Sequence, residues 1–155
     1  MAKVLGIYIA PSAGTAVAAV PQARAIRSAG LEGDRYGEGV GAFSNAKRVT
    51  IRQLSFIAIE DFRAANALAE TPFTIEETRR NVLTEGVDLQ SLIGKEFSVG
   101  GVRMRGIEDC TPCARPSNLS GKPGFAEAFA GRGGLRAEVL ETGLIKVGDP
   151  IVAPE

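Results

Sequence analysis

The sequence predicts a mainly β fold: a closed or nearly closed β-barrel of short strands, with one long helix at about residues 53–69 and short helical pieces. Nineteen glycines and eight prolines divide the 155 residues into short segments, as in chains whose strands are joined by tight turns. Only one segment carries a long helical period. The predicted strands do not alternate with helices, so a doubly wound α/β sheet is not expected.

The predicted strands are short segments bounded by turn residues, with alternating apolar positions or residue types that favour β structure. In the first of them Leu5, Ile7 and Ile9 occupy every second position. Gly100 and Gly101 lie between two others, and a Gly-Gly pair between β-type flanks predicts a two-residue hairpin. The nine predicted strands are residues 4–10, 16–20, 23–28, 48–51, 81–84, 96–99, 102–106, 137–141 and 149–152.

The predicted long helix follows from apolar residues that recur three or four positions apart, which places them on one face. These residues are Ile51, Leu54, Ala58, Phe62, Ala65 and Leu68. A second, short helix is predicted at residues 123–130, where a proline stands near the first turn. Residues 30–41, with five glycines, and residues 114–124 are predicted to be loops.

Length and charge favour one soluble domain spanning residues 1–155. Basic and acidic residues both number 18, so no overall field attracts nucleic acid or an anionic membrane, and any basic site must be local. The apolar run at residues 4–10 stops at Pro11 and suits a strand better than a signal peptide. No segment approaches the roughly 20 apolar residues of a membrane span. We expect a cytoplasmic protein without nucleic-acid or membrane partners, as a monomer or homodimer.

The chain contains no histidine. Catalysis by a Ser-His or Cys-His pair, a histidine-ligated metal and a histidine proton shuttle are therefore excluded. Any chemistry depends on Cys, Asp, Glu, Lys, Arg and Tyr.

Two cysteines, Cys110 and Cys113, stand three positions apart. A structural zinc site needs four Cys or His ligands and would require two chains to share the metal. A thioredoxin-like pair needs a helix start within a βαβ unit, which is not evident around these cysteines. The third reading is one reactive thiolate, stabilised by guanidinium groups such as those of Arg103, Arg105 and Arg115. A purely structural role as two small loop residues also stays open.

Two further clusters combine basic and polar residues. Arg79, Arg80 and Asn81 precede a predicted strand. If the backbone there is extended, the two arginines point to opposite faces, so that one binds an anion while the other pairs with a carboxylate. Asp34 and Arg35 lie in the glycine-rich loop, where backbone amides and a guanidinium suit a phosphate or oxyanion. A solvated run of charges and an ordinary loop are the competing interpretations.

Taken in order along the chain, these segments resemble the MOSC domain, named for the C-terminal part of eukaryotic molybdenum-cofactor sulfurases and also found in small stand-alone bacterial proteins. The resemblance runs from about residue 4 to residue 152. The segments that carry it are APSAG…GLEGDRYG, RVTI, TRRNVLTEGVDLQSLIGKEFSVGGVRMRGIEDCTPC and GRGGLRAEVLETGLIKVGDPI. It implies a β-barrel-like fold and a link to molybdenum-cofactor or sulfur-transfer chemistry.

Residue by residue, the resemblance assigns the family's reactive position to Cys113, which follows Pro112, and not to Cys110. Many members carry histidine where this chain has Tyr36, so no histidine-dependent proton transfer is expected. Cys113 is predicted to be the catalytic residue and the metal ligand. The residues predicted to bind the cofactor are Asp34, Arg35, Arg80, Asn81 and Arg115.

The resemblance implies one of two activities. The protein either binds the molybdenum cofactor (molybdopterin) and acts as a reductase with an electron-transfer protein, or carries sulfur on Cys113 after transfer from a cysteine desulfurase. A thiolate suits a soft metal or a transferable sulfur, and arginines suit the cofactor phosphate. The alternatives are a non-enzymatic module that binds an anion or pterin, and a Cys-x-x-C thiol-disulfide protein.

Overall fold

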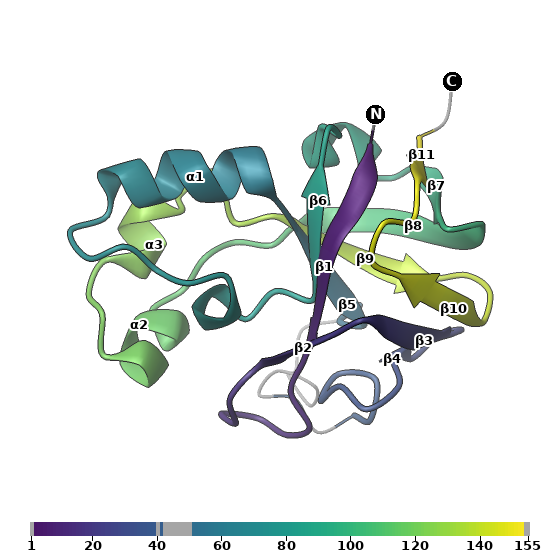
Figure 1. Ribbon diagram of the computed structural model, residues 1–155, viewed down its shortest axis with the longest axis horizontal. Helices are drawn as coiled ribbons and strands as arrows, with labels where there is room; N and C mark the ends of the chain where they lie inside the picture. The colour runs from purple at the N-terminus through teal and green to yellow at the C-terminus, as the bar shows by residue number, and fades with distance from the viewer. Residues whose placement is uncertain (1, 40, 42–50, 154–155) are drawn as a thin grey trace.

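A curved sheet of eight strands lies at the centre of the computed structural model, which describes residues 2–39, 41 and 51–153 (Figure 1). In pairing order its strands are β11 (Ile151–Val152), β7 (Glu96–Val99), β8 (Val102–Asp109), β9 (Leu135–Val139), β5 (Leu54–Ala58), β6 (Val82–Glu85), β1 (Lys3–Ile9) and β2 (Ala18–Val20). A three-stranded sheet contains β10 (Gly143–Lys146), β3 (Gln22–Ile26) and β4 (Gly30–Leu31). The helices are α1 (Ile59–Leu68), α2 (Arg115–Ser120) and α3 (Phe125–Ala128), with 3-10 turns η1 (Glu76–Thr78) and η2 (Leu89–Leu92).

The curved sheet is nearly closed. The start of β1 hydrogen-bonds to the segment that leads into β11: the Val4 amide donates to the Asp149 carbonyl at 2.9 Å, and the Ile151 amide donates to the Ala2 carbonyl at 3.0 Å. These bonds bring β1, beside one edge of the sheet, to β11 at the other edge. The prediction of a mainly β, nearly closed barrel is therefore confirmed.

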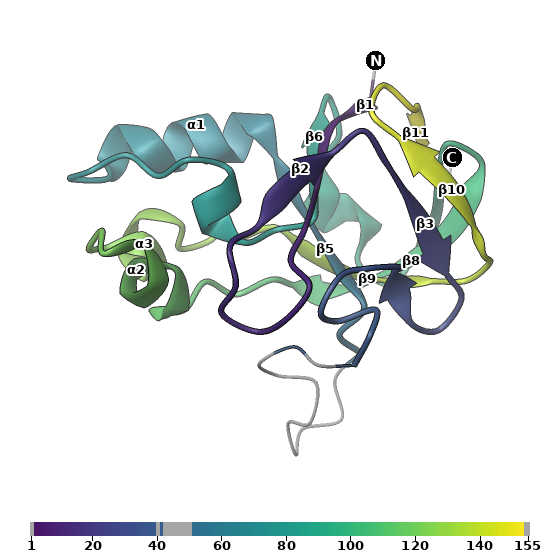
Figure 2. The same ribbon diagram turned by 60° about the horizontal axis from the view of Figure 1, so that its bottom comes forward.

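Two hydrophobic cores lie on opposite faces of the same strands. In β5 and β6, Phe56 and Val82 point into the barrel, whereas Ile57 and Leu83 point to the face that the helices cover. Successive side chains in a strand point to opposite faces. Figures 1 and 2 show α1, α2 and α3 gathered on one side of the barrel. The second core therefore attaches the helical side to the sheet.

The predicted helix at residues 53–69 is wrong in its first third. Residues 54–58 form β5, and the helix begins at Ile59. Four of the five β5 residues are buried, because both faces of this strand contact a core. A strand buried on both sides has a continuous apolar run, whose residues also fit a helical period. The sequence pattern therefore merged the strand with the helix that follows it.

Other predictions differ in smaller ways. Part of the predicted loop at residues 114–124 is helix α2, and β10 was not predicted. The strand β5, helix α1 and strand β6 form a parallel βαβ unit that the sequence did not reveal. The cysteine pair follows β8 and lies outside this unit. The predicted strand at residues 48–51 falls almost entirely outside the described residues.

The Gly-Gly hairpin is confirmed. Val99 pairs with Val102, so Gly100 and Gly101 are the two residues of the turn between β7 and β8. Their φ angles are 56° and 85°. A two-residue turn with both φ angles positive matches the twist of the flanking strands and favours glycine.

No helix in the described part of the chain is long and apolar enough to span a bilayer.

Candidate functional site

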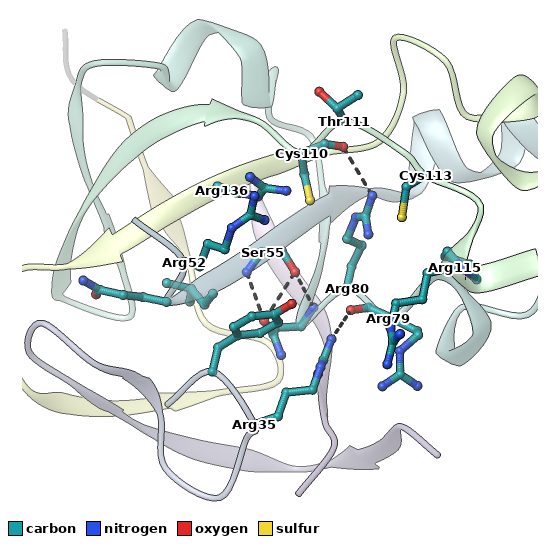
Figure 3. Close-up of a pocket in the computed structure, with 15 residues that line it drawn as sticks. Arg35, Arg52, Ser55, Arg79, Arg80, Cys110, Thr111, Cys113, Arg115 and Arg136 are labelled. Atoms are coloured by element: carbon teal, nitrogen blue, oxygen red, sulfur yellow. Dashed lines mark hydrogen bonds between the residues drawn. The ribbon is translucent and has the colours of Figure 1, made fainter. Parts of the chain in front are cut away.

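Cysteines and arginines from distant parts of the chain line one pocket of about 640 Å³, open mouth included (Figure 3). The lining segments are the turn after β4, the approach to β5, the residues between η1 and β6, the loop after β8, the start of α2, and β9. The lining residues are Arg35, Tyr36, Arg52, Gln53, Leu54, Ser55, Arg79, Arg80, Asn81, Cys110, Thr111, Cys113, Arg115, Pro116 and Arg136.

The pocket is strongly cationic. Six arginines line it, and no aspartate or glutamate is among the described lining residues. Carboxylates from outside the lining approach two of these arginines: Arg35 pairs with Asp34, and Arg136 pairs with Glu108, both at 2.9 Å. A pocket with this composition attracts anions by its local charge. The sequence predicted that any basic site in this neutral chain must be local, and this pocket is such a site.

The two cysteines differ in their surroundings. Both are free thiols, but Cys110 is buried and Cys113 is exposed. The Cys110 amide donates to the Gly134 carbonyl at 2.8 Å, which ties the end of β8 to the segment before β9. At Gly133, a Cβ atom would lie 2.1 Å from the Cys110 carbonyl oxygen, so only glycine allows this close approach. In Figure 3 both sulfur atoms point toward the pocket.

At one end of the pocket Arg35, Arg79 and Arg115 form a group that we call the Arg115 cluster (Figure 3). The Arg79 guanidinium donates through Nη1 to the Thr15 carbonyl at 2.7 Å, but its buried Nη2 has no hydrogen-bond partner among the described residues. Burial, and then the charges of Arg35 and Arg115, lower the pKa of Arg79 to about 10. An anion placed among these side chains would accept a hydrogen bond from Nη2 of Arg79 and would offset the repulsion between the three positive charges.

The backbone at Arg79 explains why both neighbouring arginines line the same pocket. Arg79 has a φ angle of 62°, in the left-handed region, where a non-glycine residue costs roughly 1–2 kcal/mol. The expectation that Arg79 and Arg80 point to opposite faces assumed extended backbone and is wrong. Within the described residues neither arginine pairs with a carboxylate; both hydrogen-bond to carbonyl groups.

Arg80 connects three segments. Its Nε donates to the Gly133 carbonyl at 2.7 Å, its Nη1 to the Thr78 carbonyl at 3.2 Å, and its Nη2 to the Cys110 carbonyl at 3.3 Å. The side chain is buried, and its guanidinium lies 5.8 Å from the centre of the Phe125 ring. Arg80 therefore positions the cysteine loop, in addition to lining the pocket.

Asp34 and Asn81 lie under the site and hold other groups. The Asp34 carboxylate is fully buried, accepts from the Ala10 and Tyr36 amides, and fixes the Arg35 guanidinium. Asn81 accepts from the Ser55 amide through Oδ1 and donates to the Tyr8 carbonyl through Nδ2. Asp34 does not line the pocket, whereas Asn81 does. Cofactor contact by these two residues stays a prediction.

At the opposite end, near Cys110, lie Arg52 and Arg136, which we call the Arg136 pair (Figure 3). Burial, and then the charge of Arg136, lower the pKa of Arg52. The Arg136 pair and Arg79 were not among the predicted cofactor-binding residues, although the sequence grouped Arg79 with Arg80 and Asn81 as a possible anion site. Arg52 and Arg136 are 84 positions apart in the sequence and come together because β5 pairs with β9.

No group of three or more Cys, Asp, Glu or His side chains that could hold a metal ion occurs in the described ranges. A single thiol such as that of Cys113 can still complete the coordination of a metal that brings other ligands with it.

Comparison with known proteins places this fold. The chain is similar to the YuaD protein of Bacillus subtilis, with 22% identity and a TM-score of 0.80 over 97% of this chain and 94% of that one. It is also similar to YiiM of Geobacillus stearothermophilus, with 16% identity and a TM-score of 0.69 over 100% and 76% of the two chains. YiiM of Escherichia coli gives 16% identity and a TM-score of 0.68 over 99% and 70%. At these identities the likeness establishes the fold alone.

No significant match was found among curated proteins. The model of the MOSC domain matches residues 43–152, more than two thirds of the chain. This protein belongs to the MOSC domain family.

Proposed function

We propose that this MOSC protein binds the molybdenum cofactor in its arginine-lined pocket, with Cys113 as the protein ligand to the metal. One observation carries the proposal: the exposed thiol and an excess of guanidinium groups converge on the same pocket, which no described Asp or Glu side chain lines. A ligand for this pocket must be anionic and must profit from a soft sulfur donor.

The Arg115 cluster fits the phosphate of the cofactor. The Arg115 side chain makes no hydrogen bond or ion pair with the described residues, and the buried Nη2 of Arg79 is likewise without a hydrogen-bond partner among them. A phosphate accepts several hydrogen bonds from guanidinium groups and carries the charge that offsets their repulsion. Arg35 is held in place for the same purpose by Asp34.

The thiol of Cys113 fits the metal. When bound, the cofactor supplies a molybdenum centre that exchanges electrons with a substrate, and the electrons come from a partner electron-transfer protein. Cys113 needs to supply only one sulfur ligand, because the pterin dithiolene supplies two. Its exposed position at the pocket gives the metal access to a substrate from solvent.

The test is the molybdenum and pterin content of protein purified gently from molybdenum-replete cells. We expect the wild type to retain both, and Arg79→Gln to lose both, because removing a charge-assisted phosphate contact weakens binding at least about tenfold. The matched control is Arg103→Gln, which removes an exposed arginine paired with Glu96 outside the pocket. A wild type with neither metal nor pterin would remove the cofactor from the proposal; pterin without metal would favour a non-catalytic binding module.

The exposure of Cys113 also favours a second candidate function, in which this thiol carries sulfur as a persulfide. A partner cysteine desulfurase can reach an exposed thiol, whereas Cys110 is buried. After incubation with a desulfurase and cysteine, we expect the mass of one added sulfur atom on the peptide that contains Cys113, removable by a reductant. Addition to Cys110, or to neither cysteine, would contradict sulfur carriage on Cys113.

A further inference from the structure

The Arg136 pair lies at the opposite end of the pocket from the Arg115 cluster, where the cofactor phosphate is proposed to bind. Figure 3 shows the Arg52 and Arg136 guanidiniums together beside Cys110, while those of Arg79 and Arg115 gather at the other end of the pocket. Arg80 separates the two ends, with its Nη2 bonded to the Cys110 carbonyl. The pocket therefore has two separate cationic ends with sulfur atoms between them.

Arg136 lines the pocket and has unused hydrogen-bonding capacity toward the described residues. Its Nη1 donates to Glu108 at 2.9 Å, but its Nε and Nη2 make no hydrogen bond with the described residues. Glu108 is 44% exposed and is not among the pocket-lining residues. Glu108 therefore occupies Nη1 of Arg136, and its charge also acts on Arg52, but it leaves Nε and Nη2 of Arg136 for another acceptor.

Arg105 is a nearby arginine whose hydrogen-bonding groups are more fully used than those of Arg136. Arg105 lies on β8, between β7 and β9. Its Nη1 bonds to Glu138 on β9, and its Nη2 bonds to Glu96 on β7. Both terminal nitrogens of this surface arginine have a carboxylate. Arg136, by comparison, pairs with one carboxylate, that of Glu108. Its guanidinium lies close enough to that of Arg52 to lower the pKa of Arg52. Two like charges held together in a half-buried site favour an anion between them.

We propose that Arg52 and Arg136 bind the anionic group of the substrate, a carboxylate or another small oxyanion, beside Cys110. That the bound anion belongs to the substrate rests on the proposed function. The proposed function places the cofactor phosphate at the Arg115 cluster and so leaves the Arg136 pair for the molecule that reacts at the metal. The planar guanidiniums suit bidentate contact with an oxyanion. The substrate class is therefore anionic, and neutral analogues bind more weakly.

The experiment titrates sulfate, as a probe oxyanion, into full-length cofactor-loaded protein labelled with ¹⁵N. The side-chain Nε–Hε signals of Arg52 and Arg136 are followed, after assignment from the Arg52→Gln and Arg136→Gln variants. We expect both signals to shift and saturate together. In Arg136→Gln the sulfate affinity reported by Arg52 falls at least about tenfold. Arg103→Gln is the control and leaves it unchanged.

A second variant keeps the test independent of any loss of packing at Arg136. Glu108→Gln removes the partly exposed carboxylate that competes for this guanidinium, so sulfate should bind more tightly than in the wild type. Weaker or unchanged binding in Glu108→Gln, or saturation that Arg136→Gln does not affect, would overturn the subsite.

Repeating the titration on a depleted form, protein shown by analysis to contain neither molybdenum nor pterin, separates this inference from the proposed function. Sulfate that shifts the Arg136 pair in both forms supports a subsite beside the cofactor. Signals that respond only in the depleted form show that the cofactor itself covers the pair, which overturns the assignment to substrate. If protein from molybdenum-replete cells contains no cofactor, the proposed function fails, and with it the assignment to substrate; the sulfate response then still decides whether the anion subsite exists.

Discussion

Cys113→Ser is expected to abolish molybdenum retention while leaving the folded protein intact. A serine hydroxyl is not ionised near neutral pH and is a poor ligand for a soft metal, whereas a thiolate is a good one. Cys113 is exposed, so the substitution should change the free energy of unfolding by no more than about 0.5 kcal/mol. At this chain length that corresponds to less than about 2 °C in Tm. Metal analysis and a thermal melt of the same sample measure both quantities.

The matched control is the other cysteine. Cys110→Ala removes a buried thiol at the same pocket, so it should lower Tm more than Cys113→Ser while molybdenum retention persists. If the Cys110 variant loses the metal and the Cys113 variant retains it, the assignment of the ligand is reversed. Equal retention in both variants would leave no cysteine as the metal ligand.

Arg80→Ala is expected to destabilise the whole fold. The substitution removes a buried guanidinium and leaves the carbonyls of Thr78, Cys110 and Gly133 without their donors. Removing one partner from a buried, charged hydrogen-bond network typically costs about 3–5 kcal/mol. For a protein of this size the expected loss in Tm is roughly 10 °C, measured by calorimetry or circular dichroism.

Two variants show whether the geometry of Arg80 matters. Arg80→Lys keeps the charge but cannot reach three carbonyls from one planar group, so it should recover only part of the stability. Arg103→Ala removes an exposed arginine whose ion pair with Glu96 contributes at most about 1 kcal/mol. If the Tm of Arg80→Ala equals that of Arg103→Ala, Arg80 does not hold the cysteine loop in place. Its role in the site is then only to contact the ligand.

The sequence predicts the β-rich fold well because its signals are local. Alternation of apolar residues identifies β1, and Gly100 with Gly101 identifies the hairpin between β7 and β8, since only a few residue types accept two positive φ angles in succession. Local signals fail at β5. Its burial on both faces depends on two cores built from distant segments, so its apolar run looked like the start of α1.

The candidate site divides in the same way. The absence of histidine and the choice of Cys113 over Cys110 come from the sequence and its family resemblance. The different exposure of the two thiols comes only from the fold. The sequence also selects Arg35, Arg80 and Arg115, all of which line the pocket. It does not distinguish Arg80, whose donors serve backbone carbonyls, from Arg115, which has no partner among the described residues.

By itself the sequence determined the Gly100-Gly101 turn, the family, and which residue types are present for chemistry. The tertiary structure alone decided that six arginines share one pocket with both cysteines, and that Arg79 and the Arg136 pair belong to it. The physical reason is that turns and periodicity depend on neighbouring residues. The charge of a pocket depends instead on contacts between segments far apart in the chain, such as the bond from Arg80 to the Gly133 carbonyl, 53 positions away.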